Sequence, residues 1–121
     1  MSSSEKAKDK TRLNLVQLAK QYFRKKGYKV ESETTLEGYS GLSRKFDLIV
    51  QKSRLVQGVW VRDWNRTIGV NVVINLDKAS EDVGLKNPMI IGGKFSGHAK
   101  SYANRRKITL LTKQRMSLDL R

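Results

Sequence analysis

Residues 45–66 constrain the fold more than any other stretch, because they have the pattern of two β-strands joined by a turn. The first strand alternates Phe46, Leu48 and Val50 with Asp47, Ile49 and Gln51. After a break at residues 53–58, the second strand alternates Val59 and Val61 with Trp60 and Arg62. A period of two residues predicts strands with one buried face, so we expect Asp47 on the face opposite Phe46 and Leu48. The rest of the chain is expected to fold around this hairpin.

Length and composition predict a single domain. The chain has 121 residues, of which 38% are hydrophobic and 30% are charged, as is typical of a globular protein. Residues 1–10 are small, polar and charged, so we expect a disordered basic arm there and the domain over residues 11–121. The sequence has no cysteine, no secretory signal and no apolar run near the roughly 20 residues that span a bilayer. We therefore expect a cytoplasmic protein.

The charge balance points to polyanionic partners. The chain has 25 Lys and Arg residues against 11 Asp and Glu residues, a net charge of +14. Residues 1–10 hold almost as many acidic as basic residues, so the excess belongs to the expected domain. We interpret it as a nucleic-acid-binding surface and expect DNA as the partner and a nucleoid-associated location, with RNA left open. A surface that is basic for solubility alone is the alternative, and an anionic membrane is disfavoured because no basic amphipathic helix is evident.

Helices and strands are predicted to alternate beyond the hairpin. In order, we expect a helix over residues 11–26 that Gly27 ends, a strand over 28–34, a loop over 36–44, the hairpin, a helix over 68–83, a strand over 88–91, a helix over 97–106 and a strand over 108–112. Residues 70–74 are β-branched or Asn and could form a strand. A helix is favoured there because the hairpin and the next strand need a crossover between them.

The last nine residues have a third pattern. Met116, Leu118 and Leu120 alternate with polar residues, which predicts an edge strand or a subunit contact. Because an apolar edge would be left in water by a monomer, we expect a homodimer.

Four stretches of sequence, in this order, resemble one known family. They are RKKGY at residues 24–28, FDLIV at 46–50, VWVRDW at 59–64 and PMIIGGKFSGHAKSYA at 88–103. With them the chain resembles the restriction-endonuclease-like PD-(D/E)xK superfamily, and within it the Mrr-like and archaeal Holliday-junction-resolvase branch. The resemblance covers residues 13–112. It implies a three-layer α/β/α fold with a central mixed sheet of about five strands, and double-stranded or branched DNA as the partner.

The resemblance also identifies the positions of the family's metal site. Asp47 falls on the metal-binding aspartate, Trp60 falls where the family has glutamate, and Arg62 falls where it has lysine. The acidic residue that several relatives have on the first helix is missing, since residues 16–18 are Val, Gln and Leu. Mg²⁺ usually needs more than one anionic contact. We therefore expect no cofactor and no catalytic residues beyond these vestigial positions, with Asp47 left as a weak metal candidate.

A relocated carboxylate is the alternative that would restore a metal site. Glu31, Glu33 and Glu37 are geometrically free to approach Asp47, whereas Asp63 is expected to face away from it. Mg²⁺ would be the cofactor in that case.

The residues predicted to contact nucleic acid are basic or lie at a helix start. They are Arg44, Lys45, Arg62, Arg66, Lys94, Ser96, Lys100, Arg105 and Arg106. Ser96 is equally expected as a helix N-cap, and Arg105 and Arg106 are partly explained by the helix dipole. Trp60 could stack on a base or sit in the core, and His98, the single histidine, is expected at the surface.

Three functions remain open on the sequence. The first is a DNA-binding protein of nuclease-like fold with an incomplete metal site, an accessory in recombination, repair or genome maintenance. The second is an active Mg²⁺-dependent endonuclease or junction resolvase with a rearranged site. The third is an adaptor that binds another protein of a DNA-processing complex.

Overall fold

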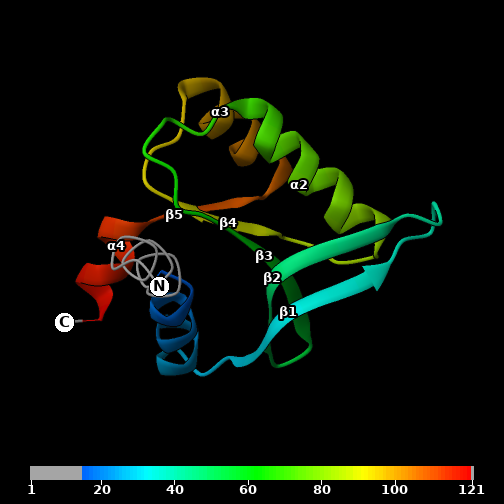
Figure 1. Ribbon diagram of the computed structural model, residues 1–121, viewed down its shortest axis with the longest axis horizontal. Coiled ribbons are helices and arrows are strands. Elements are labelled where there is room, and N and C mark those ends of the chain that lie inside the picture. The colour runs from blue at the N-terminus through cyan, green and yellow to red at the C-terminus, as the bar shows by residue number, and fades with distance from the viewer. Residues whose placement is uncertain (1–14, 121) are drawn as a thin grey trace, which may run out of the picture.

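A five-stranded mixed sheet forms the centre of the computed structural model, which describes residues 15–120 (Figure 1). In chain order, the elements are the N-terminal helix, described over residues 15–25, then β1 (Lys29–Glu37), β2 (Ser43–Lys52), β3 (Leu55–Arg62), α2 (Val70–Asp82), β4 (Met89–Gly92), α3 (Gly97–Arg106), β5 (Thr109–Thr112) and α4 (Lys113–Asp119). The expected arm over residues 1–10 and the expected helix start at 11–14 lie outside the described residues. The predicted order of the elements up to β5 is confirmed.

The sheet has the strand order β1-β2-β3-β4-β5, so sequence neighbours are also spatial neighbours. The pairs β1–β2 and β2–β3 are antiparallel, whereas β3–β4 and β4–β5 are parallel. Each parallel pair needs a crossover, which α2 and α3 provide. The helix predicted over residues 68–83 is therefore confirmed at Val70–Asp82, despite its β-branched start.

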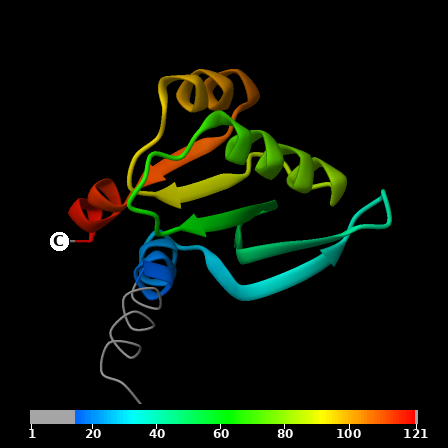
Figure 2. The ribbon, with the colours of Figure 1, turned by 45° about the horizontal axis from the view of Figure 1, so that its top comes forward.

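Helices cover both faces of the sheet, which gives the predicted three layers. Figure 2 shows α2 and α3 on one face and the N-terminal helix on the other. The cluster beneath α2 and α3 includes Phe46, Ile49, Ile68, Val73, Leu76 and Ile90, and the cluster beneath the N-terminal helix and α4 includes Phe23, Leu48, Val50, Val59, Ile91 and Met116. Each large apolar side chain that is fully buried contributes about 1.5–3 kcal/mol to folding.

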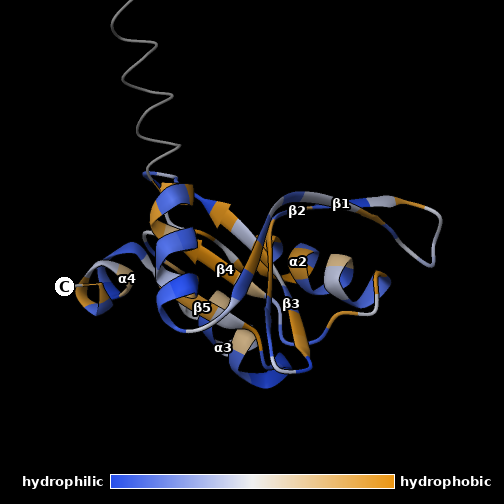
Figure 3. Cartoon of the chain, turned by 90° about the horizontal axis from the view of Figure 1, so that it is seen from below, coloured by the Kyte–Doolittle hydropathy of each residue, from blue (hydrophilic) through white to orange (hydrophobic). Residues whose placement is uncertain are grey.

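Polar residues lie on the outside of these layers. In Figure 3 the outward side of the N-terminal helix is mostly hydrophilic, and the central strands behind it are mostly hydrophobic.

Among residues 15–120, no helix is both long enough and apolar enough to span a membrane.

The hairpin of β2 and β3 differs from the expectation at its turn. The turn consists of Ser53 and Arg54, so residues 55–58 belong to β3 and the expected longer break is wrong. Gly58 pairs with Ile49, and a Cβ atom at Gly58 would lie 2.6 Å from ring carbons of Phe46. Glycine is needed at this position because the Phe46 ring covers the backbone there.

The predicted alternation in β2 also fails, at Asp47. Phe46 packs with Ile49 under α2, whereas Leu48 packs on the other face, so Phe46 and Leu48 do not share a side of the sheet. The paired register of β2 with β3 begins at Leu48 and Val59. Glu33 of β1, between the positions that pair with Phe46 and Leu48, has a φ of 31°. The strands are therefore distorted around Asp47.

The C-terminal segment is a helix, so the predicted edge strand is wrong. Thr112 caps α4 by accepting a hydrogen bond from the backbone N–H of Arg115 at 3.1 Å. Met116 is fully buried under the sheet, whereas Leu118 is 58% exposed. Dimerisation remains a prediction, but Met116 no longer supports it because its side chain belongs to the core.

The burial of Met116 predicts unequal effects of two substitutions in α4. Met116→Ala should lower the free energy of unfolding by about 2–5 kcal/mol, because it removes buried methylene groups and leaves a cavity. Leu118→Ala, as the matched control on the exposed side, should change it by no more than about 0.5 kcal/mol. Urea denaturation of both variants measures the difference. Equal losses would contradict the observed helix and favour the alternating strand.

Candidate nucleic-acid interface

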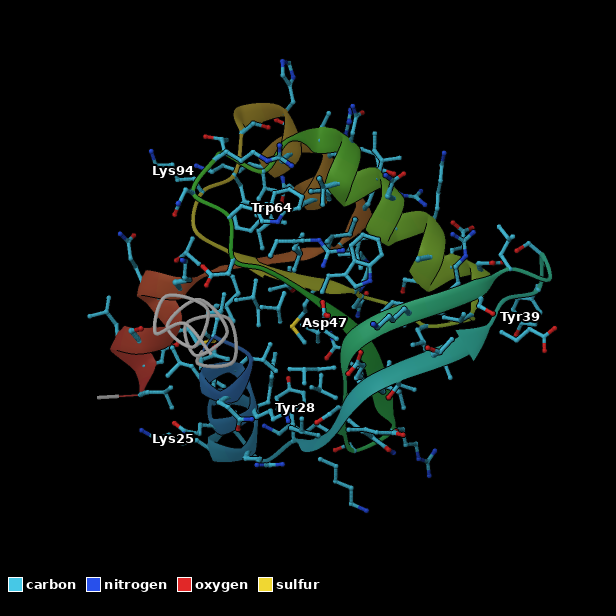
Figure 4. The ribbon with its side chains drawn as sticks, in the orientation of Figure 1. Lys25, Tyr28, Tyr39, Asp47, Trp64 and Lys94 are labelled. Atoms are coloured by element: carbon cyan, nitrogen blue, oxygen red, sulfur yellow. The ribbon has the colours of Figure 1, made fainter. Side chains whose placement is uncertain are left out.

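The ends of β3 and β4 bring several predicted residues to one edge of the sheet. These strands are parallel and Arg62 pairs with Gly92, so their carboxyl ends lie together. In open α/β sheets this edge is the usual place for ligands. The following loops remain paired, because Ile68 N–H donates to Lys94 O at 2.9 Å and Ser96 N–H donates to Ile68 O at 3.0 Å. Figure 4 shows Trp64 and Lys94 on the same side of the sheet.

Asp47 and Arg62 form an ion pair at this edge. Oδ2 of Asp47 accepts hydrogen bonds from the backbone N–H of Val61 at 2.7 Å and from Nη1 of Arg62 at 3.3 Å. About a quarter of each side chain is exposed, 29% for Asp47 and 26% for Arg62. The carboxylate therefore serves two purposes, since it replaces a missing backbone partner for Val61 and balances the charge of the guanidinium.

Trp60 lies partly in the core, which is one of its two predicted roles, and stacking on a base stays a prediction. Its indole Nε1–H donates to the backbone oxygen of Lys45 at 3.0 Å, and the side chain packs against the cluster beneath α2. The guanidinium carbon of Arg62 lies 4.5 Å from the centre of the Trp60 ring, which is within cation–π range. Trp60 is therefore a partly buried support for Arg62.

Comparison with known proteins agrees with this architecture. The family model of the Mrr catalytic domain, described as restriction endonuclease, matches residues 9–117. The chain belongs to this restriction-endonuclease family. The crystal structure of the protein of unknown function AF1548 superposes with a TM-score of 0.75 at 16% sequence identity. The match covers 81% of this chain and 56% of that chain, and at this identity it shows the fold alone. A sequence search of curated proteins found no match.

The residues at this site do not fit the Mg²⁺ ion that a restriction-endonuclease fold implies. Mg²⁺ is bound through oxygen ligands, usually carboxylates together with water. Asp47 supplies one carboxylate, but the guanidinium of Arg62 lies against it and the indole of Trp60 lies against that guanidinium. Within residues 15–120 there is no group of three or more His, Asp or Glu side chains that could hold a metal ion.

Two of the carboxylates considered as replacements have other partners. Asp63 forms an ion pair with Lys113 at the start of α4. Glu33 forms an ion pair with Lys45 at 2.7 Å, and both side chains are largely exposed. The predicted nucleic-acid residue Lys45 is thus balanced by a carboxylate.

Arg62 belongs to a set of four side chains that we call the Arg–Trp ladder, namely Trp60, Arg62, Trp64 and Arg66. The guanidinium carbon of Arg66 lies 4.4 Å from the Trp64 ring centre, and that of Arg62 lies 6.0 Å from the same ring. Trp64 was missed by the prediction of binding residues. The spacing Trp-x-Arg-x-Trp-x-Arg was the available signal, because it continues the period of β3 beyond the end of the strand at Arg62.

Arg44 has a structural position away from this edge. Its Nε donates to Oδ2 of Asp82 in α2 at 2.8 Å. Asp82 also accepts from Ser40 Oγ at 2.6 Å and from Ser40 N–H at 2.9 Å. The hydrogen bonds from Ser40 and then from Arg44 lower the pKa of Asp82 from 3.8 to about 2. Arg44 thereby fastens the β1–β2 loop to the end of α2.

Arg106 has a similar structural position on the other side of α2. Its Nε donates to Oδ2 of Asp77 at 2.9 Å, and Glu81 lies 3.6 Å from its Nη2. Tyr102 O–H donates to the same Asp77 oxygen at 2.7 Å, and this bond is the main cause of a raised pKa of Tyr102. The hydrogen bond to Asp77 likewise raises the pKa of Arg106. These contacts hold α3 against α2.

The remaining predicted residues lie in or beside α3. Ser96 is the N-cap, as expected, because its Oγ accepts from Ala99 N–H at 3.1 Å. Lys94, Lys100 and Arg105 are exposed, and none of them has a carboxylate partner within residues 15–120. His98 is exposed, as expected. The structure therefore groups Arg62, Arg66 and Lys94 at one edge and places Arg44 and Arg106 in ion pairs elsewhere.

The low pKa of Asp82 predicts a pH-dependent contribution to stability. The folded protein keeps this carboxylate ionised below the pH at which the unfolded chain protonates it. The contribution of this carboxylate to the free energy of unfolding is therefore complete above about pH 4 and is lost as the pH falls towards 2. The free energy of unfolding should fall more steeply between pH 4 and 2 in the wild type than in Asp82→Asn. Denaturation curves at several pH values measure both slopes, and identical slopes would contradict the network around Asp82.

Proposed function

We propose that this chain is a DNA-binding protein of the restriction-endonuclease family that does not cleave DNA, and that it acts as an accessory in recombination, repair or genome maintenance. The observation on which this rests is the guanidinium of Arg62, which lies 3.3 Å from Asp47 and on the face of Trp60. A cation therefore occupies the side of Asp47 where a metal-binding site would need a second carboxylate.

The same arrangement favours binding of phosphate groups. The ion pair with Asp47 uses Nη1 of Arg62, and the Trp60 ring supports the guanidinium plane. A guanidinium is a good partner for phosphate because it donates several hydrogen bonds from one rigid plane. Arg66 and Lys94 lie in the two loops joined by the pairing of Ile68 with Phe95. Together they extend the cationic surface beyond Arg62.

Contacts of this kind carry little sequence information. Arginine and lysine side chains that bind phosphates fix the position of a protein on DNA, whereas sequence is read from the base edges. The grouped cations come from a strand end and two loops, so they suit the backbone of DNA with any sequence. We therefore propose binding that depends on the structure of DNA more than on its sequence.

A second candidate function, an adaptor for another protein, is favoured by the tip of the β1–β2 hairpin. Tyr39 is 87% exposed and Leu42 is 58% exposed, and Figure 1 shows this tip projecting from the rest of the molecule. Asp82 holds the tip in place through Ser40. Loss of a partner's binding in Tyr39→Ser, with unchanged affinity for bare DNA, would distinguish this function from the first.

Binding driven by phosphates predicts a strong dependence on salt. Each neutralised phosphate releases counterions, so five to eight contacts give a slope of log affinity against log salt of about −4 to −7. Fluorescence anisotropy with linear, forked and four-way DNA at several salt concentrations measures this slope. An affinity that does not change with salt would contradict the electrostatic basis of the proposal.

The proposed loss of the metal centre predicts no cleavage of these DNAs by the wild type in Mg²⁺ or Mn²⁺. Arg62→Ala should weaken DNA binding by about 1–3 kcal/mol, the usual range for a charge-assisted contact. Asp47→Asn should leave affinity unchanged or raise it, because it keeps an acceptor for Val61 N–H and removes a negative charge near the phosphates. Cleavage assays test the first expectation, and gel-shift assays measure the DNA affinities of the two variants.

Arg54→Ala is the matched control for these variants. Arg54 lies in the turn between β2 and β3, at the opposite end of β3 from Arg62, and it is exposed. This variant removes one cation and should change affinity less than Arg62→Ala. Metal-dependent cleavage by the wild type that disappears in Asp47→Asn would overturn the proposal.

A further inference from the structure

The Arg–Trp ladder contains both tryptophans of the chain. Arg62 lies 4.5 Å from the centre of the Trp60 ring and 6.0 Å from that of Trp64, and Arg66 lies 4.4 Å from the latter. Cations and aromatic rings thus alternate along one side of the chain, from the end of β3 into the loop that follows. Such an alternation offers flat faces and positive charge over a short distance.

The two rings differ in how they are held. Trp60 is in β3, its N–H is bonded to Lys45 O, and its ring packs against the core. Trp64 follows the end of the strand, is half-buried and also packs against the same core cluster, but its indole N–H makes no hydrogen bond within residues 15–120. Trp60 is therefore fixed, whereas Trp64 lies in a segment without strand pairing and keeps part of its ring surface accessible.

The cation beside Trp64 is also available. Arg66 is exposed, and no carboxylate within residues 15–120 forms an ion pair with it. The pairing of Ile68 with Phe95 brings the loop of Lys94 alongside the loop of Trp64, so the adjacent loop carries a second exposed cation. An aromatic ring with one guanidinium over it and a second cation on the adjacent loop suits a nucleotide, whose base stacks on the accessible part of the ring while its phosphates pair with the charges.

We propose that the Arg–Trp ladder is a stacking site for an unpaired nucleobase, so that the protein prefers strands with unpaired bases to a continuous duplex. This inference rests on the proposed binding of nucleic acid and names the form that is preferred. In a continuous duplex the faces of each base are covered by its neighbours, so a base reaches Trp64 only from a single strand, a flap or a branch point. The base lies on the exposed part of the Trp64 ring, and Arg66 and Lys94 bind the adjacent phosphates.

Intrinsic fluorescence tests the stacking directly. Trp60→Phe leaves Trp64 as the single tryptophan of the chain and keeps an aromatic ring at position 60. This variant is titrated with a DNA strand of about 12 nucleotides, the RNA strand of the same sequence, the corresponding blunt duplex and an abasic strand of equal length, since site sizes of 4–16 nucleotides are usual. The base-containing strands should quench Trp64, whereas the abasic strand and the duplex should quench it little.

Affinities of two variants at position 64 complete the test. Trp64→Ala should weaken binding of the base-containing strand by about 5- to 100-fold and should leave the affinity for the abasic strand unchanged. Trp64→Phe keeps a smaller aromatic face and should lie between the wild type and Trp64→Ala. Arg54→Ala, at the other end of β3, should weaken all strands by the same small factor. Comparison of the RNA strand with the DNA strand of the same sequence shows which of the two binds more tightly.

Three outcomes would overturn the inference. The first is quenching by the abasic strand or the duplex equal to that by the base-containing strand. The second is equal loss of affinity for base-containing and abasic strands in Trp64→Ala. The third is tight, salt-dependent binding of every ligand without quenching, which would leave the proposed DNA-binding function intact. An absence of binding to any of these nucleic acids would overturn both proposals.

Discussion

The carboxylate of Asp47 holds together the part of the sheet on which the candidate interface is built. It accepts the backbone N–H of Val61 at a point where the ladder of β2 and β3 has already ended, and so it extends their association towards the end of β3. A buried or half-buried N–H without a partner is costly, and this contact removes that cost. The change of face between Phe46 and Leu48, the glycine at position 58 and the ion pair with Arg62 all occur around this one residue.

Aspartates elsewhere in the molecule also serve internal contacts. Every aspartate among residues 15–120 lies in an ion pair, and those at positions 77 and 82 connect α2 to α3 and to the β1–β2 loop. Asp77 and Asp82 thus neutralise cations that the fold needs for its own packing. Arg66 in the loop after β3 and Lys94 in the β4–α3 loop are left without such partners among these residues and contribute positive charge to this edge.

The sequence predicted those parts of the fold that depend on local patterns. Ser96 and the residues after it determine α3 through an N-cap, and the direction of β4 requires the crossover that α2 supplies. The C-terminal helix was missed because Met116, Leu118 and Leu120 have the spacing of a strand. The N-cap at Thr112 and the burial of Met116 in the core stabilise a helix instead. Distant partners were beyond prediction, since Arg44 and Asp82 are 38 residues apart and Arg106 and Asp77 are 29 apart.

The position of Trp60 has a consequence for how such a chain can evolve. By the resemblance to the family, exchange of this residue for glutamate would place a second acid near Asp47 in one step. The same step would remove the hydrogen bond to Lys45 O, the ring that supports Arg62 and part of the packing beneath α2. A substitution that adds a second carboxylate beside the pair of Asp47 and Arg62 would therefore lower the stability of the fold, so the packing of Trp60 itself opposes such a change.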